Sequence, residues 1–126
     1  MVLKGKVAVV TGSAKGIGRG VACTLAGQGV LIAGLDVDAS DNAETANRIA
    51  AMGGQFMALN CDVADKHAVK RAIADVVDNY GQIDLLINNA GYWDNSALTQ
   101  GDYDSQTAEF DRSMGASALG SYYVTR

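Results

Sequence analysis

The sequence predicts an α/β fold: a doubly wound parallel sheet with helices on both faces. Four short apolar runs alternate with longer segments of helical periodicity. Within each run the apolar residues are largely consecutive rather than alternating, which is typical of strands buried between two helix layers. Alternating strands and helices indicate a parallel sheet, and right-handed crossovers place its helices on both faces.

The predicted strands cover residues 7–10, 30–33, 55–59 and 83–87. The first ends at Thr11-Gly12, the second near Asp36 and the fourth at Asn88-Asn89-Ala90-Gly91. We expect the strand order 3-2-1-4, which leaves the fourth strand at an edge. That strand is more apolar than exposed edge strands normally are, so we expect something to pair with it.

Helices are predicted between the strands from apolar residues at helical spacing. The first has Ile17, Val21 and Leu25 and is closed by Gly27 and Gly29. The other three stripes are Ala43, Ala46, Ile49 and Ala50; Val69, Ala72, Ile73, Val76, Val77 and Tyr80; and Phe110, Met114, Ala118 and Tyr122. Asp65 is the expected N-cap of the third helix and Gly81 its C-terminal residue in the left-handed conformation. Residues 91–109 are rich in polar and acidic side chains, and we expect a solvated loop there.

Composition limits the class of protein. The 126 residues suit one domain, 1–126, and 48% hydrophobic residues with 19% charged ones argue against disorder. A net charge of −4 without a basic cluster excludes a broad nucleic-acid surface. No apolar run approaches the roughly 20 residues of a membrane helix. Two cysteines form no disulfide framework, and no Cys/His cluster has metal-ligand spacing, so we expect a cytoplasmic protein without a metal.

The strongest local motif is the glycine-rich segment from Thr11 to Gly18, between the first strand and the first helix. Gly12 permits a tight turn, Gly16 lets a diphosphate approach the backbone, and Gly18 allows the helix to pack against the strand. The free N–H groups and the dipole of the helix N-terminus favour an anion. The segment therefore predicts a Rossmann-like dinucleotide site, against the alternative of a purely structural turn.

Asp36 lies 18 residues beyond Gly18, at the end of the second strand. An acid about 20 residues beyond the glycines binds the adenosine ribose hydroxyls. Its charge would repel a 2′-phosphate, which favours NAD over NADP. Two alternatives stay open: Asp36 caps the next turn, or Lys15 pairs with a 2′-phosphate.

These motifs together resemble the classical short-chain dehydrogenase/reductase family. The resemblance rests on Thr11-Gly12-x-x-x-Gly16-Ile17-Gly18, on Cys61-Asp62-Val63 and on Asn88-Asn89-Ala90-Gly91, and it covers residues 4–126. It implies a diphosphate-binding segment, an adenosine-binding group and a segment along the middle of the cofactor. The residues concerned are, in that order, Gly12, Ser13, Lys15, Gly16, Ile17 and Gly18; Asp36, Val37, Asp62 and Val63; and Asn89, Ala90 and Gly91. Structural alternatives remain for Asp62, as a cap, and for the asparagines, as a turn that ties the sheet together.

The sequence departs from the family in its catalytic residues. Family members use a Ser, a Tyr and a Lys, of which the last two are spaced Tyr-x-x-x-Lys. None of the five tyrosines here is followed four residues later by lysine. The nearest match is Tyr122 with Arg126. A family asparagine thought to hold a proton-relay water aligns with Ser117, which is either a candidate relay residue or an ordinary helix serine. Since family members are about twice this length, the chain corresponds to a truncated, cofactor-binding half.

The resemblance implies an NAD-dependent oxidoreductase that moves a hydride between the nicotinamide and an alcohol or carbonyl substrate. We expect residues 1–126 alone to be inactive, and we expect a homo-oligomer or a pairing with the C-terminal half. Two other hypotheses remain: a non-catalytic dinucleotide-binding fragment, and a degenerate subunit that assembles with an active homologue.

Overall fold

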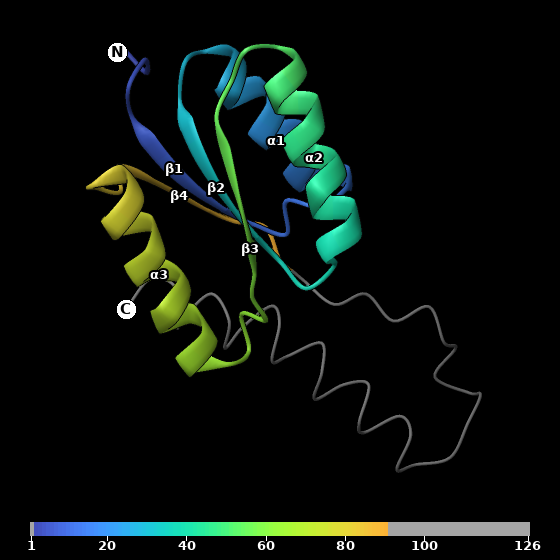
Figure 1. The fold of residues 1–126 in the computed structure, drawn as a ribbon, viewed down its shortest axis with the longest axis vertical. Coiled ribbons are helices and arrows are strands. Elements are labelled where there is room, and N and C mark those ends of the chain that lie inside the picture. Colours follow the sequence, from blue (N-terminus) through green and yellow to red (C-terminus); the bar gives the residue numbers. More distant parts are fainter. Residues whose placement is uncertain (1, 91–126) are drawn as a thin grey trace, which may run out of the picture.

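A computed structural model of the chain describes residues 2–90, which form strands and helices in strict alternation (Figure 1). The bounds are β1 Val7–Thr11, α1 Gly16–Gly27, β2 Leu31–Asp36, α2 Ala39–Ala51, β3 Phe56–Asn60, α3 Lys66–Tyr80 and β4 Leu85–Asn88. The α/β class predicted from the sequence is confirmed. The solvated loop and the last helix, predicted after residue 90, lie outside the described residues.

The strands form one parallel sheet in the order β3-β2-β1-β4, which confirms the predicted order. β1 lies inside the sheet, where Val9 pairs with Ala33 of β2 and with Leu86 of β4. Within the described residues β4 is at one end of the sheet and β3 at the other.

Both faces of β1 are buried, each against a different helix layer. Val7 and Val9 pack in a core that includes Val69 and Val76 of α3. Ala8 and Val10 pack in a second core with residues of α1 and α2. Figure 1 shows α1 and α2 together on one side of the sheet and α3 on the other. Burial on both faces explains why consecutive residues of this strand are apolar.

The third helix has the predicted ends. The Asp65 carboxylate accepts hydrogen bonds from the N–H groups of His67 and Ala68, and Gly81 ends the helix at φ +82°. The left-handed conformation costs glycine no Cβ clash, so it is the usual residue at this position.

The predicted core faces of α1 and α2 are partly wrong. α1 buries Gly18, Ala22 and Ala26, whereas Ile17 is 77% exposed. Small residues are needed there, because a Cβ at Gly18 would clash with the Gly12 carbonyl oxygen.

In α2 the buried residues are Asn42, Thr45 and Ile49, and only Ile49 belongs to the predicted apolar stripe. The part of this helix that faces the segment after β1 is polar, because Asn42 and Thr45 form hydrogen bonds with that segment.

Strand boundaries differ from the expected ones by a few residues. The second strand begins after Val30 and continues through Gly34 to Asp36, and the fourth begins after Ile83 and Asp84. Asp84 instead closes the turn before β4: its N–H donates to the Val7 carbonyl, and its carboxylate accepts from the Val7 N–H. None of the helices in residues 2–90 is long and apolar enough to cross a membrane.

Candidate functional site

The candidate site lies at the carboxyl ends of β1, β2 and β4. From β1 the chain proceeds outward to β2 and β3, and then returns to place β4 on the other side of β1. In open α/β sheets a ligand crevice forms where the strand order reverses in this way, outside the carboxyl ends of the strands. The glycine-rich turn, residues 12–16, lies at this reversal, directly after β1, and its last residue Gly16 begins α1.

Three glycines shape the turn for three different reasons. Gly12 has φ +71°, and a Cβ there would be 3.0 Å from the Ala90 Cα. Gly18 has no room for a side chain against the Gly12 carbonyl. Gly16 has φ +62°, and a Cβ there would meet nothing within 4 Å, so this part of the turn borders open space. The turn is thus packed on its inner side and open at Gly16.

The first turn of α1 offers main-chain donors to that open space. Lys15 is the N-cap residue and its side chain makes no capping hydrogen bond. The Arg19 N–H donates to the Lys15 carbonyl, so the preceding N–H groups of Gly16, Ile17 and Gly18 have no acceptor within the helix. Free donors and the positive end of the helix dipole suit an anionic group.

The Thr11 hydroxyl joins the ends of β1 and β4. Its oxygen accepts hydrogen bonds from the N–H groups of Asn89 at 2.9 Å and Ala90 at 3.0 Å, and it lies 3.4 Å from the Ile87 carbonyl. The Asn89 side-chain amide donates to the Gly12 carbonyl at 3.3 Å. Asn89 and Ala90 are thereby held against the glycine-rich turn. These bonds are those of a turn that ties the sheet together, the structural alternative given above for the asparagines.

Ser13 does not present its side chain to the crevice. The residue is fully buried, and its hydroxyl donates to Asn42 Oδ1 at 2.7 Å. Any contact of Ser13 with a ligand would therefore come from its main chain.

Asp36 lies beside the turn and already has two main-chain partners. Its Oδ2 accepts from the Ala14 N–H at 3.0 Å and its Oδ1 from the Asp38 N–H at 2.9 Å. A carboxylate has about four acceptor positions, so two lone pairs remain for further donors. Asp36 therefore holds the turn, and it retains the capacity to accept hydroxyl groups.

The side chains around Asp36 combine charge with exposed apolar surface. Hydrogen bonding from the Asp41 N–H and, to a smaller extent, the charge of Lys15 lower the pKa of the Asp38 carboxyl. Val37 follows Asp36 and is 64% exposed. Ile17 is also exposed, beside the opening at Gly16. These exposed apolar side chains are available to the uncharged parts of a ligand.

The segment Cys61-Asp62-Val63 reaches the same edge of the sheet. The Cys61 N–H donates to the Asp36 carbonyl at 3.1 Å, which places Asp62 just after this contact. Asp62 is exposed and its carboxylate accepts from the Ala64 N–H, so it does form the local cap. Val63 is 5% exposed and packs in the core beside α3.

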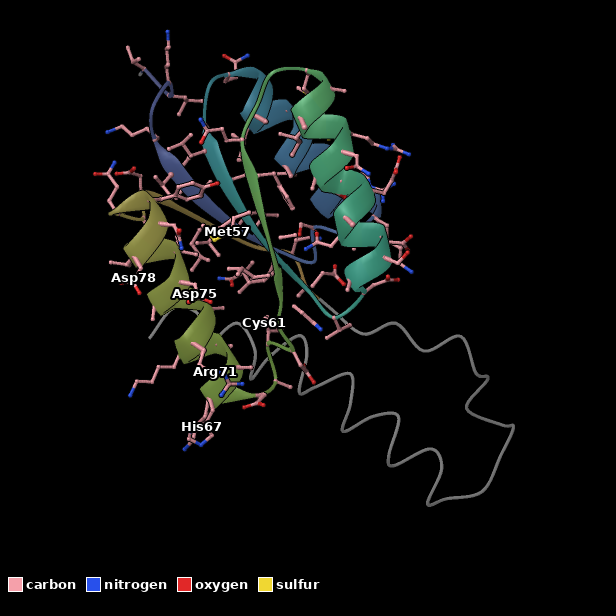
Figure 2. The ribbon with its side chains drawn as sticks, viewed as in Figure 1. Met57, Cys61, His67, Arg71, Asp75 and Asp78 are labelled. Atoms are coloured by element: carbon pink, nitrogen blue, oxygen red, sulfur yellow. The ribbon has the colours of Figure 1, made fainter. Side chains whose placement is uncertain are left out.

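Cys61 has no features of a nucleophile. It is 3% exposed, and burial, followed by the charges of Asp62 and Asp65, raises the pKa of its thiol to about 11. Figure 2 shows it at the end of β3, and His67 at the solvent-exposed start of α3. Among residues 2–90 no group of His, Cys, Asp and Glu could hold a metal ion.

The structure brings most of the predicted residues to one edge of the sheet. Gly12 and Gly16 belong to the turn itself, and Asp36 and Asn89 bond to it. Gly91 and Ser117 lie outside the described residues.

Sequence reasoning missed a group of residues that support the turn from below. Asn42 and Thr45 bond to it, and Gly34 makes room for it, since a Cβ at Gly34 would clash with Ser13 Oγ and with Phe56. A usable signal was present: two polar residues three apart in α2 occupy positions that the hydrophobic pattern should have filled.

Comparison with known proteins agrees with this geometry. The family model described as short chain dehydrogenase matches residues 6–126. The short-chain reductase protein NovJ of Streptomyces niveus is 37% identical over 121 residues, which are 95% of this chain and 46% of that protein.

Solved structures show the same fold. An NAD⁺-bound xylitol dehydrogenase matches with a TM-score of 0.88 and 34% identity, over 99% of this chain and 47% of that one. A metagenomic short-chain oxidoreductase in complex with NADP matches with a TM-score of 0.86 and 29% identity, over 100% and 56%. The chain thus spans about half the length of the relatives it matches.

Proposed function

Because this chain belongs to the short-chain dehydrogenase/reductase family, we propose that it forms the cofactor-binding half of an NAD-dependent oxidoreductase. The substrate is an alcohol in one direction and a carbonyl compound in the other. The observation that carries the proposal is the glycine-rich turn, which is closed on its inner side and open at Gly16, where the free N–H groups of α1 begin.

The residues at the sheet edge fit a dinucleotide in three places. The diphosphate lies at Gly16, Ile17 and Gly18, where main-chain donors are free. The adenosine lies toward Asp36, whose remaining lone pairs accept the ribose hydroxyls, and toward the exposed side chains of Val37 and Asp62. Asn89, Ala90 and Gly91 follow the middle of the cofactor. In this arrangement Ser13 and Val63 contribute through main chain and packing, because both side chains are buried.

NAD rather than NADP is the proposed cofactor. Near the expected ribose position, the negative charges of Asp36 and Asp38 outnumber the positive charge of Lys15. A 2′-phosphate would bring negative charge to this surface and be repelled.

The chemistry itself belongs to the nicotinamide, which accepts or donates the hydride when bound. This chain binds and orients the cofactor. Ser117 stands at the position of the family's relay asparagine, and we keep it as a candidate for holding a water there. The acid–base group for the substrate oxygen lies outside this chain, since no Tyr-x-x-x-Lys is present in it.

A second candidate function applies if the protein consists of these residues alone. A protein made of these residues alone would bind the dinucleotide without turnover, or would assemble with an active homologue. The 126 residues have a mass of 13.1 kDa. For the first function we expect an intact mass about twice that, with Tyr-x-x-x-Lys in the additional part, because the relatives are about twice this length. A protein of 13.1 kDa would support the second.

The site is tested with Gly16→Ala, with Gly53→Ala as matched control. Both glycines have positive φ and open surroundings, but Gly53 lies in the turn before β3, at the amino ends of the strands and opposite the candidate site. We expect Gly16→Ala to raise the Kd for NADH at least about tenfold, because the Cβ blocks close backbone approach. Gly53→Ala should leave Kd unchanged. Equal binding by both variants, or no binding of NADH or NADPH by the parent, would overturn the proposed function.

A further inference from the structure

Beneath the glycine-rich turn, α2 has two polar side chains that are fully buried, Asn42 and Thr45. They are three residues apart and so lie on one face of the helix. Burying polar groups costs free energy unless they are hydrogen-bonded, and both of these residues form hydrogen bonds with the turn. An apolar pair at these positions would have been the simpler way to pack a helix on a sheet.

Asn42 joins the turn to β2. Its Oδ1 accepts the hydrogen bond from the Ser13 hydroxyl at 2.7 Å, and its Nδ2 donates to the Gly34 carbonyl at 3.0 Å. Only glycine fits at position 34, because a Cβ there would clash with Ser13 Oγ. The amide therefore holds the Ser13 side chain against the centre of the sheet.

Thr45 holds the main chain of the turn. Its hydroxyl lies 2.9 Å from the Ser13 carbonyl oxygen and 3.2 Å from that of Ala14, with the Asp41 carbonyl of its own helix further away at 3.4 Å. The hydroxyl has a single proton to donate, and the Ser13 carbonyl is its nearest acceptor. The same oxygen accepts from Arg19 Nε at 2.9 Å, and Arg19 Nη2 donates to the Asp41 carbonyl at 3.0 Å. The contact with Arg19 links α2 to the first turns of α1.

These bonds decide which way the peptide groups of the turn face. The carbonyl oxygens of Ser13 and Ala14 are held inward by Thr45, and that of Gly12 by the Asn89 amide. Carbonyl oxygens carry partial negative charge and would repel a phosphate, whereas N–H groups attract it. A turn whose peptides could rotate would present both kinds of group to the ligand.

We propose that Asn42 and Thr45 are positioning residues for the diphosphate of the cofactor: they hold the carbonyl groups of the turn away from it. This inference rests on the proposed function. The benefit is preorganisation, because the donors of α1 meet the anion without any reordering of the turn on binding.

The test compares Thr45→Val with Thr45→Ser and Ile49→Val in the full-length protein. Thr45→Val keeps the side-chain shape and removes the hydroxyl, whereas Thr45→Ser keeps the hydroxyl. Ile49 is fully buried one turn further along α2 and packs in the apolar core, so its variant reports loss of stability without loss of the network. The readouts are Kd for NADH by fluorescence titration and the melting temperature of each variant.

We expect Thr45→Val to raise Kd about tenfold and Thr45→Ser to change it about twofold at most. Ile49→Val should lower the melting temperature with Kd unchanged. If Thr45→Val binds NADH as the parent does, or if Ile49→Val weakens binding equally, the positioning role is wrong and the proposed function stands. If the parent binds neither NADH nor NADPH, the proposed function fails, and the inference fails with it.

Discussion

The carboxylate of Asp36 combines a structural and a proposed functional role. It accepts the N–H groups of Ala14 and Asp38 and so fixes the turn beside the end of β2. The lone pairs that remain are those that the proposed function assigns to the hydroxyls of the adenosine ribose. Replacing this residue therefore risks the turn itself, unless the substitute keeps an acceptor oxygen.

Asp36→Asn removes the charge and keeps one acceptor oxygen, so one of the two main-chain hydrogen bonds to Ala14 and Asp38 is lost together with the charge. We expect the parent to bind NADH more tightly than NADPH, because Asp36 repels the 2′-phosphate. In Asp36→Asn the ratio of the two Kd values should shift toward NADPH by about tenfold. Fluorescence titration with both dinucleotides measures this ratio.

Lys15→Ala is the companion variant for the same question. Without the charge of Lys15 near Asp38, NADPH binding should weaken further in relation to NADH. A parent that prefers NADPH, with Lys15→Ala abolishing the preference, would show that Lys15 and not Asp36 decides the choice.

At the scale of elements, α1 shows how close packing limits the choice of residue. Gly18 faces the Gly12 carbonyl and the Asn89 amide, so the helix can approach the end of β1 only without a side chain there. Gly20 lies two residues further along the same helix, and a Cβ there would meet nothing within 4 Å. The two glycines share a helix and differ only in what surrounds them.

Gly18→Ala and Gly20→Ala should consequently change stability in opposite directions. We expect Gly18→Ala to destabilise the protein by about 3 kcal/mol, since main chain must shift to admit the methyl group. Gly20→Ala should stabilise it by about 0.5–1 kcal/mol, because alanine loses less conformational freedom in a helix. Urea unfolding of both variants measures the difference. Equal effects of the same sign would show that the turn does not pack on α1 as described.

The capping of α3 by Asp65 makes part of its stability depend on pH. Hydrogen bonds from the N–H groups of Ala68 and, to a smaller extent, His67 lower the pKa of this carboxyl from the usual 3.8. A group whose pKa is lower in the folded state stabilises the fold at pH values above the unfolded pKa. That contribution is lost as the pH falls through the folded value.

Asp65→Ala should lower the melting temperature at pH 7, where the cap is ionised. The difference from the parent should shrink as the pH falls below 3.8, the usual value for this carboxyl. Thermal melts between pH 7 and pH 2.5 measure it. Asp78→Ala is the control, since Asp78 is exposed near the other end of α3, where a negative charge is not favoured by the helix dipole. A difference that persists unchanged at the lowest pH would contradict the cap.

At the scale of the whole molecule, the two ends of the described sheet differ. In β4 the three consecutive large side chains Leu85, Leu86 and Ile87 are each half-buried, and they contact both cores. In β3 the side chains of Phe56, Met57 and Leu59 are also half-buried against the two cores, but those of Ala58 and Asn60 are exposed, so this strand is less apolar than β4. Apolar side chains on both faces of a strand indicate a strand inside a sheet, so we expect the sheet to continue beyond β4 and to end at β3.

Hydrogen exchange in the full-length protein distinguishes the two edges. Both strands have N–H groups that point away from their described neighbour. We expect those of residues 85–88 to be protected by a further strand, and those of residues 56–60 to exchange quickly. Fast exchange at both edges would show that β4 is a true edge. It would also favour a self-contained binding module over half of a larger domain.

Much of this organisation follows from local sequence. The four strands, the helix between each pair and both ends of α3 were predictable, because they depend on apolar runs, glycines and caps that lie close together in the chain. The expected order β3-β2-β1-β4 was confirmed as well, although it joins strands as distant in the chain as β1 and β4. The position of Asp36 beside the turn followed too, from the parallel arrangement of β1 and β2. Which faces of α1 and α2 are buried did not follow, since hydrophobic periodicity cannot register a close approach that only Gly18 and Ala22 permit.

The sequence by itself therefore determined the fold class, the family and the edge of the sheet at which the candidate site lies. Only the tertiary structure decided how the turn is held. The Ser13 side chain points inward to Asn42, the Thr45 hydroxyl lies against two carbonyl groups of the turn, and the Thr11 hydroxyl joins β1 to β4. The physical reason is that these bonds connect residues 29 or more positions apart. Their partners become neighbours only after the sheet has formed, so no local pattern specifies them.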